Sequence, residues 1–214
     1  MSFWKNIFST QNNDESSVRE LTHPKDLQTG DIIKFKYLPQ SILSNQQFQI
    51  SSIGTYDFED RHLTEFKLSG NTDETLFMMV DDSGDETILT ISIKINRNMT
   101  EEMFDLDQFA LVFDGDGHTT LTRKQEPQAY QGWTAPSYRQ EICAEAGYYY
   151  KKDYRNMPLP QYQGAGDPLE YYRLISDDRQ FAIEAEVYEG GETDVLMTLR
   201  RPLSDIDEMW PSAS

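Results

Sequence analysis

The chain has 214 residues, which suits one large β domain or two modules of about 100 residues each. Its 37 acidic and 19 basic side chains give a formal net charge of −18. This charge opposes binding to nucleic acid and to anionic membrane surfaces, because binding to phosphate depends on Lys and Arg. No run approaches the roughly 20 apolar residues of a membrane-spanning helix. Cys143 is the only cysteine, so no internal disulfide can form and a cytoplasmic protein is expected.

The chain begins with a small apolar cluster and a polar segment. Phe3, Trp4, Ile7 and Phe8 would share one face of a helical turn, and residues 9–17 are polar. Residues 1–24 are therefore predicted to be an apolar peptide and its linker, separate from the folded body. We interpret the four apolar residues as a partner-binding motif for another protein or for a second copy of this chain. The alternative interpretation is a frayed end.

Residues 25–104 are predicted to form a first β module. Apolar and polar residues alternate in strand-like runs, and residues 82–85 have the composition of a hairpin turn. Closely spaced antiparallel strands of this kind predict a small barrel or sandwich. The expected strands are Asp31–Leu38, Phe48–Tyr56, Leu63–Ser69, Leu76–Val80 and Thr87–Ile95. The side chains expected in their core are Phe35, Phe77, Leu89, Ile91 and Ile93.

Residues 105–214 are predicted to form a second β module with a Tyr- and Pro-rich insertion over residues 127–168. Residues 137–146 fit a short helix with a capping box at Ser137 and Gln140, and they also fit a strand. The other expected strands are Phe109–Phe113, His118–Thr122, Glu170–Ser176, Phe181–Tyr188 and Val195–Arg200. The side chains expected in the core are Phe181, Ile183, Val187, Val195 and Met197.

A weak self-match relates the two modules. At one offset, residues 63–68 match 169–174, residues 84–87 match 190–193, and residues 102–104 match 208–210. The sequence therefore predicts a mainly β protein of two tandem, duplicated antiparallel modules with few short helices. The alternative is two unrelated hairpins that share common β patterning.

Two resemblances follow from these features. The apolar start, the polar linker and the acidic β-rich body resemble the YjfK-like family of uncharacterised bacterial proteins. Residues 27–95 are also similar to a small bacterial domain of unknown function, through Leu27-x-x-Gly30-Asp31, Gly54-Thr-Tyr56, Glu65-Phe-Lys-Leu68 and Asp82-x-Gly84. Phe77 departs from that pattern, where Trp is expected. The resemblances imply a cytoplasmic bacterial protein encoded near phage-shock-type membrane-stress proteins, and they carry no active site to transfer.

No residue pattern in the sequence predicts a catalytic residue, a metal ligand set or a cofactor. Cys143 lacks a local signature of a nucleophile and is interpreted as a small thiol that is buried or half-buried. Residues 114–118, Asp-Gly-Asp-Gly-His, depart from the EF-hand pattern and fit a hairpin turn. Glu184 and Glu186 share one face of a strand, which we interpret as a solvated outer face. The tyrosines of residues 148–162 are interpreted as packing residues, with a sugar or peptide platform as the alternative.

The expected function is that of an adaptor or regulator that binds other proteins, linked to membrane stress. The alternative is an enzyme or a small-ligand binder that uses a cleft between the modules. A concave site with converging polar groups would favour the alternative. An exposed apolar patch would favour the adaptor.

Overall fold

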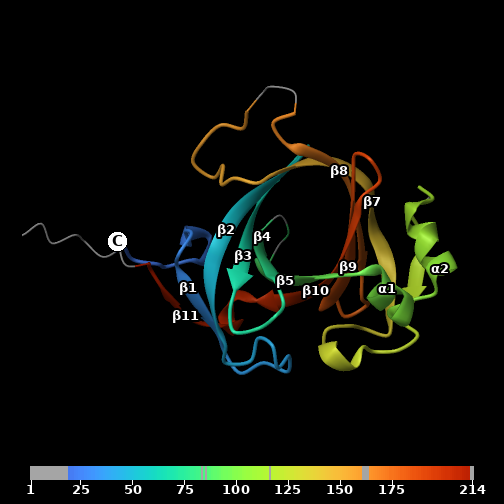
Figure 1. Cartoon of the computed structure of the whole chain (residues 1–214), viewed down its shortest axis with the longest axis horizontal. Helices are drawn as coiled ribbons and strands as arrows, with labels where there is room; N and C mark the ends of the chain where they lie inside the picture. Colours follow the sequence, from blue (N-terminus) through green and yellow to red (C-terminus); the bar gives the residue numbers. More distant parts are fainter. Residues whose placement is uncertain (1–18, 83, 85, 116, 161–163, 213–214) are drawn as a thin grey trace, which may run out of the picture.

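The strands form one antiparallel sheet that closes on itself (Figure 1). A computed structural model describes residues 19–82, 84, 86–115, 117–160 and 164–212. The 11-stranded sheet has the order β11-β1-β2-β3-β4-β5-β10-β9-β8-β7-β6, and β2 also pairs with β7. Strands β2 to β5 and β7 to β10 therefore make a closed ring, from which β1, β11 and β6 extend. The prediction of a mainly β protein is confirmed.

The strands of the first half are β1 (Ile32–Phe35), β2 (Gln47–Phe58), β3 (His62–Ser69), β4 (Leu76–Asp81) and β5 (Ile88–Ile95). Those of the second half are β6 (Thr120–Thr122), β7 (Ser137–Tyr150), β8 (Asp167–Ile175), β9 (Phe181–Tyr188), β10 (Thr193–Pro202) and β11 (Ile206–Trp210). The short helices α1 (Arg97–Met103) and α2 (Leu106–Ala110) lie outside the ring (Figure 1). Single 3-10 turns occupy Pro24–Asp26, Leu111–Phe113, Gln128–Tyr130 and Leu203–Asp205.

Each half of the chain supplies one consecutive run of the ring. β2 to β5 come from the first half and β7 to β10 from the second, and the two runs meet at β5–β10 and at β2–β7. At the β5–β10 contact, Ser92 lies opposite Thr198, which is also its match in the self-comparison. The third matched segment differs, because residues 102–104 end a helix and its following turn whereas residues 208–210 form β11. The duplication and the division at residue 104 therefore stay predictions.

The two faces of the ring differ in chemistry. Tyr56 of β2 hydrogen-bonds Glu186 of β9, and Tyr149 of β7 hydrogen-bonds Glu65 of β3. These strands are not neighbours in the ring, so the bonds cross its interior. Successive side chains of a strand point to opposite faces. The neighbours of these polar residues therefore point outward, where the largest apolar cluster lies beneath α1, α2 and the segments that follow β1 and β6.

The structure corrects part of the expected secondary structure. Phe109–Phe113 is not a strand: it lies in α2 and the next 3-10 turn, where Asp105 accepts hydrogen bonds from the backbone N–H groups of Asp107 and Gln108 as N-cap. Residues 137–146 belong to β7, because pairing with β6 and β8 supplies partners that an isolated helix would lack. The expected hairpin turn at residues 82–85 includes residues 83 and 85, which lie outside the described residues.

Most of the expected core is buried. Phe35, Leu89, Ile91, Ile93, Ile183, Val195 and Met197 are buried as predicted. The prediction for Phe77 is wrong, because the outward face of β4 carries Leu76, Met78 and Val80 instead. Phe77 is half-buried beneath the ammonium group of Lys94, and Phe181 and Val187 are also half-buried.

Candidate functional site

The interior of the ring holds a network of glutamates and tyrosines. The hydroxyl oxygen of Tyr56 lies 2.6 Å from one carboxyl oxygen of Glu186 and 3.3 Å from one of Glu65. Tyr149 donates to the other oxygen of Glu65 at 2.8 Å, and Tyr188 donates to the other oxygen of Glu186 at 2.7 Å. One phenol thus connects two buried carboxyl groups that come from β3 and β9.

A second branch of the network surrounds Glu184. Its carboxylate accepts hydrogen bonds from Tyr171 and from Thr198, both at 2.7 Å. The hydroxyl groups of Thr198 and Ser92 lie 2.8 Å apart. Since Thr198 donates its hydrogen to Glu184, Ser92 donates to Thr198. Both carboxyl oxygens of Glu184 therefore have a hydroxyl donor.

The interpretation of Glu184 and Glu186 as a solvated outer face is wrong. Both side chains are only 4% exposed, and so is Glu65. Burial, with the charge of Glu186 nearby, raises the pKa of Glu65 to about 7, against the hydrogen bonds from Tyr149 and Tyr56 and the charge of Lys94. Burial also raises the pKa of Glu186. The interior therefore holds buried carboxyl groups with raised pKa values, which no local pattern of the sequence predicts.

The centre is closely packed. A void of about 20 Å³ lies among Tyr56, Glu65, Tyr171, Glu184 and Glu186, which is room for about one water molecule. A substrate does not fit there. A larger cleft of about 460 Å³ opens at one mouth of the ring, and both Tyr149 and Tyr188 line it. These two phenols therefore contact the cleft and the buried carboxyl groups at once.

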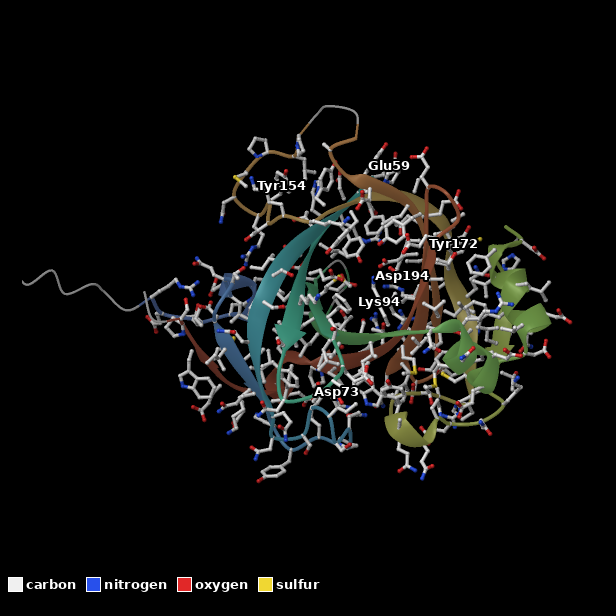
Figure 2. All side chains as sticks on the ribbon, in the orientation of Figure 1. Glu59, Asp73, Lys94, Tyr154, Tyr172 and Asp194 are labelled. Atoms are coloured by element: carbon white, nitrogen blue, oxygen red, sulfur yellow. The ribbon has the colours of Figure 1, made fainter. Side chains whose placement is uncertain are left out.

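The mouth cleft is strongly charged. Lys94 pairs with Asp194, and Lys151 pairs with Asp167 at 2.9 Å. Figure 2 labels Lys94 and Asp194 within the outline of the ring. Lys94 is the cation that lowers the pKa values of both Glu65 and Glu186. The cleft thus supplies positive charge to the buried carboxyl pair.

A glycine makes room for one of the crossing bonds. A Cβ atom on Gly54 of β2 would lie 2.5 Å from the hydroxyl oxygen of Tyr149 and 2.8 Å from its ring. Only a residue without a side chain lets this ring pass over β2 to reach Glu65. Gly54 belongs to the Gly54-Thr-Tyr56 motif of the sequence, and this close approach gives the motif a physical role.

A second cleft, of about 670 Å³, lies on the outer face of the ring beneath residues 151–160, which we call the strap. The strap leaves β7 and passes over β2 and β3 (Figure 1). Thr55 of β2 donates to the carbonyl of Lys152 at 3.0 Å and accepts from the N–H of Tyr154 at 3.1 Å. Arg155 donates to the carbonyl of Lys25, and its guanidinium lies 5.3 Å from the ring centre of Phe66. The strap is therefore fastened over the cleft at several points.

The strap cleft combines apolar walls with available hydroxyl groups. Phe66, Val80, Met157, Pro158, Leu159 and Pro160 contribute apolar surface. Tyr150 and Tyr154 meet edge to face at 5.4 Å between ring centres. Within the described chain, the hydroxyl groups of Tyr150, Tyr154 and Thr64 make no hydrogen bond to protein. The charged groups are paired, Lys25 with Asp82 and Arg155 with Asp153, and the imidazole of His62 lies 3.0 Å from the carboxyl group of Asp57.

The remaining candidate residues from the sequence lie away from the two clefts or outside the described part of the chain. Phe3, Trp4, Ile7, Phe8 and Tyr162 lie outside the described residues. Cys143 is a free, half-buried thiol that packs against the main apolar cluster, as interpreted. Residues 114–118 join the 3-10 turn to β6, with residue 116 outside the described part. Within the described ranges, no three His, Cys, Asp or Glu side chains gather as they would around a metal ion.

The fold and the sites define a closed antiparallel β ring with a carboxyl–phenol interior and a strapped outer cleft. Comparison with protein-family models, with curated proteins and with solved structures finds no match. Among the described residues, no helix is long and apolar enough to cross a membrane. The two clefts and the interior are therefore the candidate functional sites.

Proposed function

We propose that this protein binds a small, uncharged ligand in the strap cleft. The observation that carries the proposal is a concave space of about 670 Å³ that combines apolar and aromatic side chains with a few charged and polar ones, and whose tyrosine hydroxyls have no partner among the described residues. Small-molecule sites have this size and this combination of apolar walls with few polar groups. The cleft also uses residues from both expected modules, such as Thr64 and Tyr154, as the alternative expectation from the sequence required.

The chemistry of the lining indicates the class of ligand. Lys25 and Arg155, which line the cleft, each pair with a carboxylate, so a charged ligand would have to displace an ion pair. Aromatic rings pack against apolar faces, and phenols and Thr64 hydrogen-bond to hydroxyl groups. A molecule with an apolar ring face and several hydroxyl groups satisfies both requirements. A sugar is such a molecule, which agrees with the alternative platform interpretation of the Tyr-rich segment.

The test is binding of a panel of neutral mono- and disaccharides, measured by saturation-transfer NMR and then by calorimetry. We expect Tyr154→Ala to weaken binding about tenfold, since loss of a central aromatic contact costs roughly 1–2 kcal/mol. The matched control is Tyr37→Ala, because Tyr37 is 83% exposed and does not line the cleft. If no sugar shows saturation transfer, or if Tyr154→Ala binds as well as the control, the proposal is wrong.

The adaptor role expected from the sequence remains a second proposal, together with a cytoplasmic location and a link to membrane stress. It depends on Phe3, Trp4, Ile7 and Phe8. The exposed large apolar side chains of the described chain are Tyr37, Leu111, Tyr148 and Met157, which come from separate elements. A pull-down that compares the full chain with residues 18–214 tests this role. Equal capture of partners by both forms would remove the N-terminal peptide from it.

A further inference from the structure

A single phenol hydroxyl in the interior of the ring lies within hydrogen-bond distance of two buried carboxyl groups. Tyr56 has a single hydroxyl hydrogen, and the shorter distance, 2.6 Å, assigns that hydrogen to Glu186. The second contact, 3.3 Å to Glu65, then joins two oxygen atoms. At 3.3 Å the phenol oxygen and the Glu65 carboxyl oxygen are close enough for a hydrogen bond, provided that a hydrogen is available for it. Glu65 can supply it if its carboxyl group is protonated, because a carboxylic acid donates one hydrogen bond.

The groups around Glu65 and Glu186 also favour a proton on the Glu65 carboxyl group. Facing Glu65 are Tyr56 from β2, Tyr149 from β7, Glu186 from β9 and Lys94 from β5. Facing Glu186 are Tyr56, Tyr188, Glu184 and Lys94. Lys94 is the one cation among the described groups that face Glu65 and Glu186, and it also pairs with Asp194 at the mouth cleft. Two buried carboxylates with so little compensating charge repel each other, so one of them retains a proton.

We propose that Glu65 and Glu186, bridged by Tyr56, form an interior proton-binding site that holds one proton at neutral pH and releases it as the pH rises further. Tyr149 and Tyr188 hydrogen-bond the two carboxyl groups and also line the mouth cleft, where the proton exchanges with water. The site is separate from the strap cleft and does not depend on a ligand there.

The titration has a defined sign. The pKa of Glu65 is raised to about 7 in the folded protein, from an ordinary value of 4.5. The folded state therefore binds more protons than the unfolded state between these values, and the stability from this group is complete below pH 4.5. It decreases as the pH rises through about 7. Because the two carboxyl groups interact, the observed midpoint belongs to the pair.

The direct test is a titration of the glutamate side-chain carboxyl carbons by ¹³C NMR on the full-length protein. We expect one carboxyl resonance to move with a midpoint near pH 7 while exposed glutamates titrate near their usual values. In Glu65→Gln, which imitates the protonated acid, this transition should disappear. The control is Glu59→Gln, which changes an exposed glutamate at the β2–β3 turn and should leave the transition in place.

Tyr56→Phe supplies an independent measurement. Removing the bridging hydroxyl should move the midpoint of the pair, because the hydrogen bonds to both carboxyl groups are lost, whereas Tyr37→Phe should leave it unchanged. The proposal is overturned if every glutamate of the wild-type protein titrates near its usual value. It is also overturned if a neutral transition survives unchanged in Glu65→Gln.

Discussion

Two adjacent tyrosines of β8 allow a matched test of the polar interior. Tyr171 points into the ring and donates to buried Glu184 at 2.7 Å. Tyr172 points outward and donates to Glu170 at 2.8 Å, and Glu170 is exposed to solvent. Changing either residue to Phe removes one hydroxyl group and keeps the buried ring. The two variants therefore differ in whether water can replace the lost donor.

The expected costs follow from that difference. Tyr171→Phe leaves one oxygen of a buried carboxylate without its donor, which costs roughly 1–3 kcal/mol. Tyr172→Phe leaves a carboxylate that water can solvate, so its cost should be below about 1 kcal/mol. Burial raises the pKa of Tyr171 well above its ordinary value, so its hydroxyl remains a donor throughout the usual pH range. Equilibrium urea denaturation of both variants and the wild type measures the difference.

An equal loss of stability in the two variants would refute the reasoning, because the interior would then behave as a solvated space. A stabilising effect of Tyr171→Phe would refute it more strongly. In that case Glu184 would have to be neutral or free to find another donor.

Three further predictions concern the framework of the ring. Ile91→Ala should reduce the free energy of unfolding by about 2–5 kcal/mol in urea denaturation, because the side chain is fully buried in the main cluster; a loss below about 1 kcal/mol would contradict its place there. Gly54→Ala should cost about 1–3 kcal/mol, since the new methyl group collides with Tyr149, whereas Gly84→Ala meets open space and should be nearly neutral in the same assay. Cys143→Ser should fold with an unchanged circular dichroism spectrum, and rapid reaction of the native thiol with a labelling reagent would contradict its interpretation as an inert packing residue.

The strands were predictable because alternation is a local property. In β9, Ile183 and Ala185 alternate with Glu184 and Glu186, and this pattern correctly predicts a strand with two different faces. It does not say which face meets solvent. The face that carries Glu184 and Glu186 is predicted to be exposed to solvent, because a charge is usually costly to bury. In this ring, phenol and hydroxyl groups from other strands donate hydrogen bonds to the buried carboxyl groups. No local pattern of the sequence predicts these donors.

The closure of the ring and the candidate sites depend on distant residues. Residues 55–58 pair with 147–150, and nothing in either segment specifies the other. The network around Glu65 combines β2, β3, β7 and β9, so its members never appear together in the sequence. The composition of the Tyr-rich segment is visible in the sequence. That it forms a strap follows only from its contacts, which include those of Thr55 and Arg155. The sequence predicts a few short helices but not the positions of α1 and α2, because helices of two turns or less leave little periodic pattern.

The β2–β7 pairing also has a consequence for synthesis of the chain. A ribosome that has synthesised the chain through β5 has produced five strands, and the free edge of β5 and residues 55–58 of β2 have no partners yet. Their partners, β7 and β10, arrive only with the last third of the polypeptide. Open strand edges recruit other chains, and incomplete sheets aggregate. We therefore expect translation that stops before β10 to yield insoluble fragments, because both open edges are still free to recruit other chains.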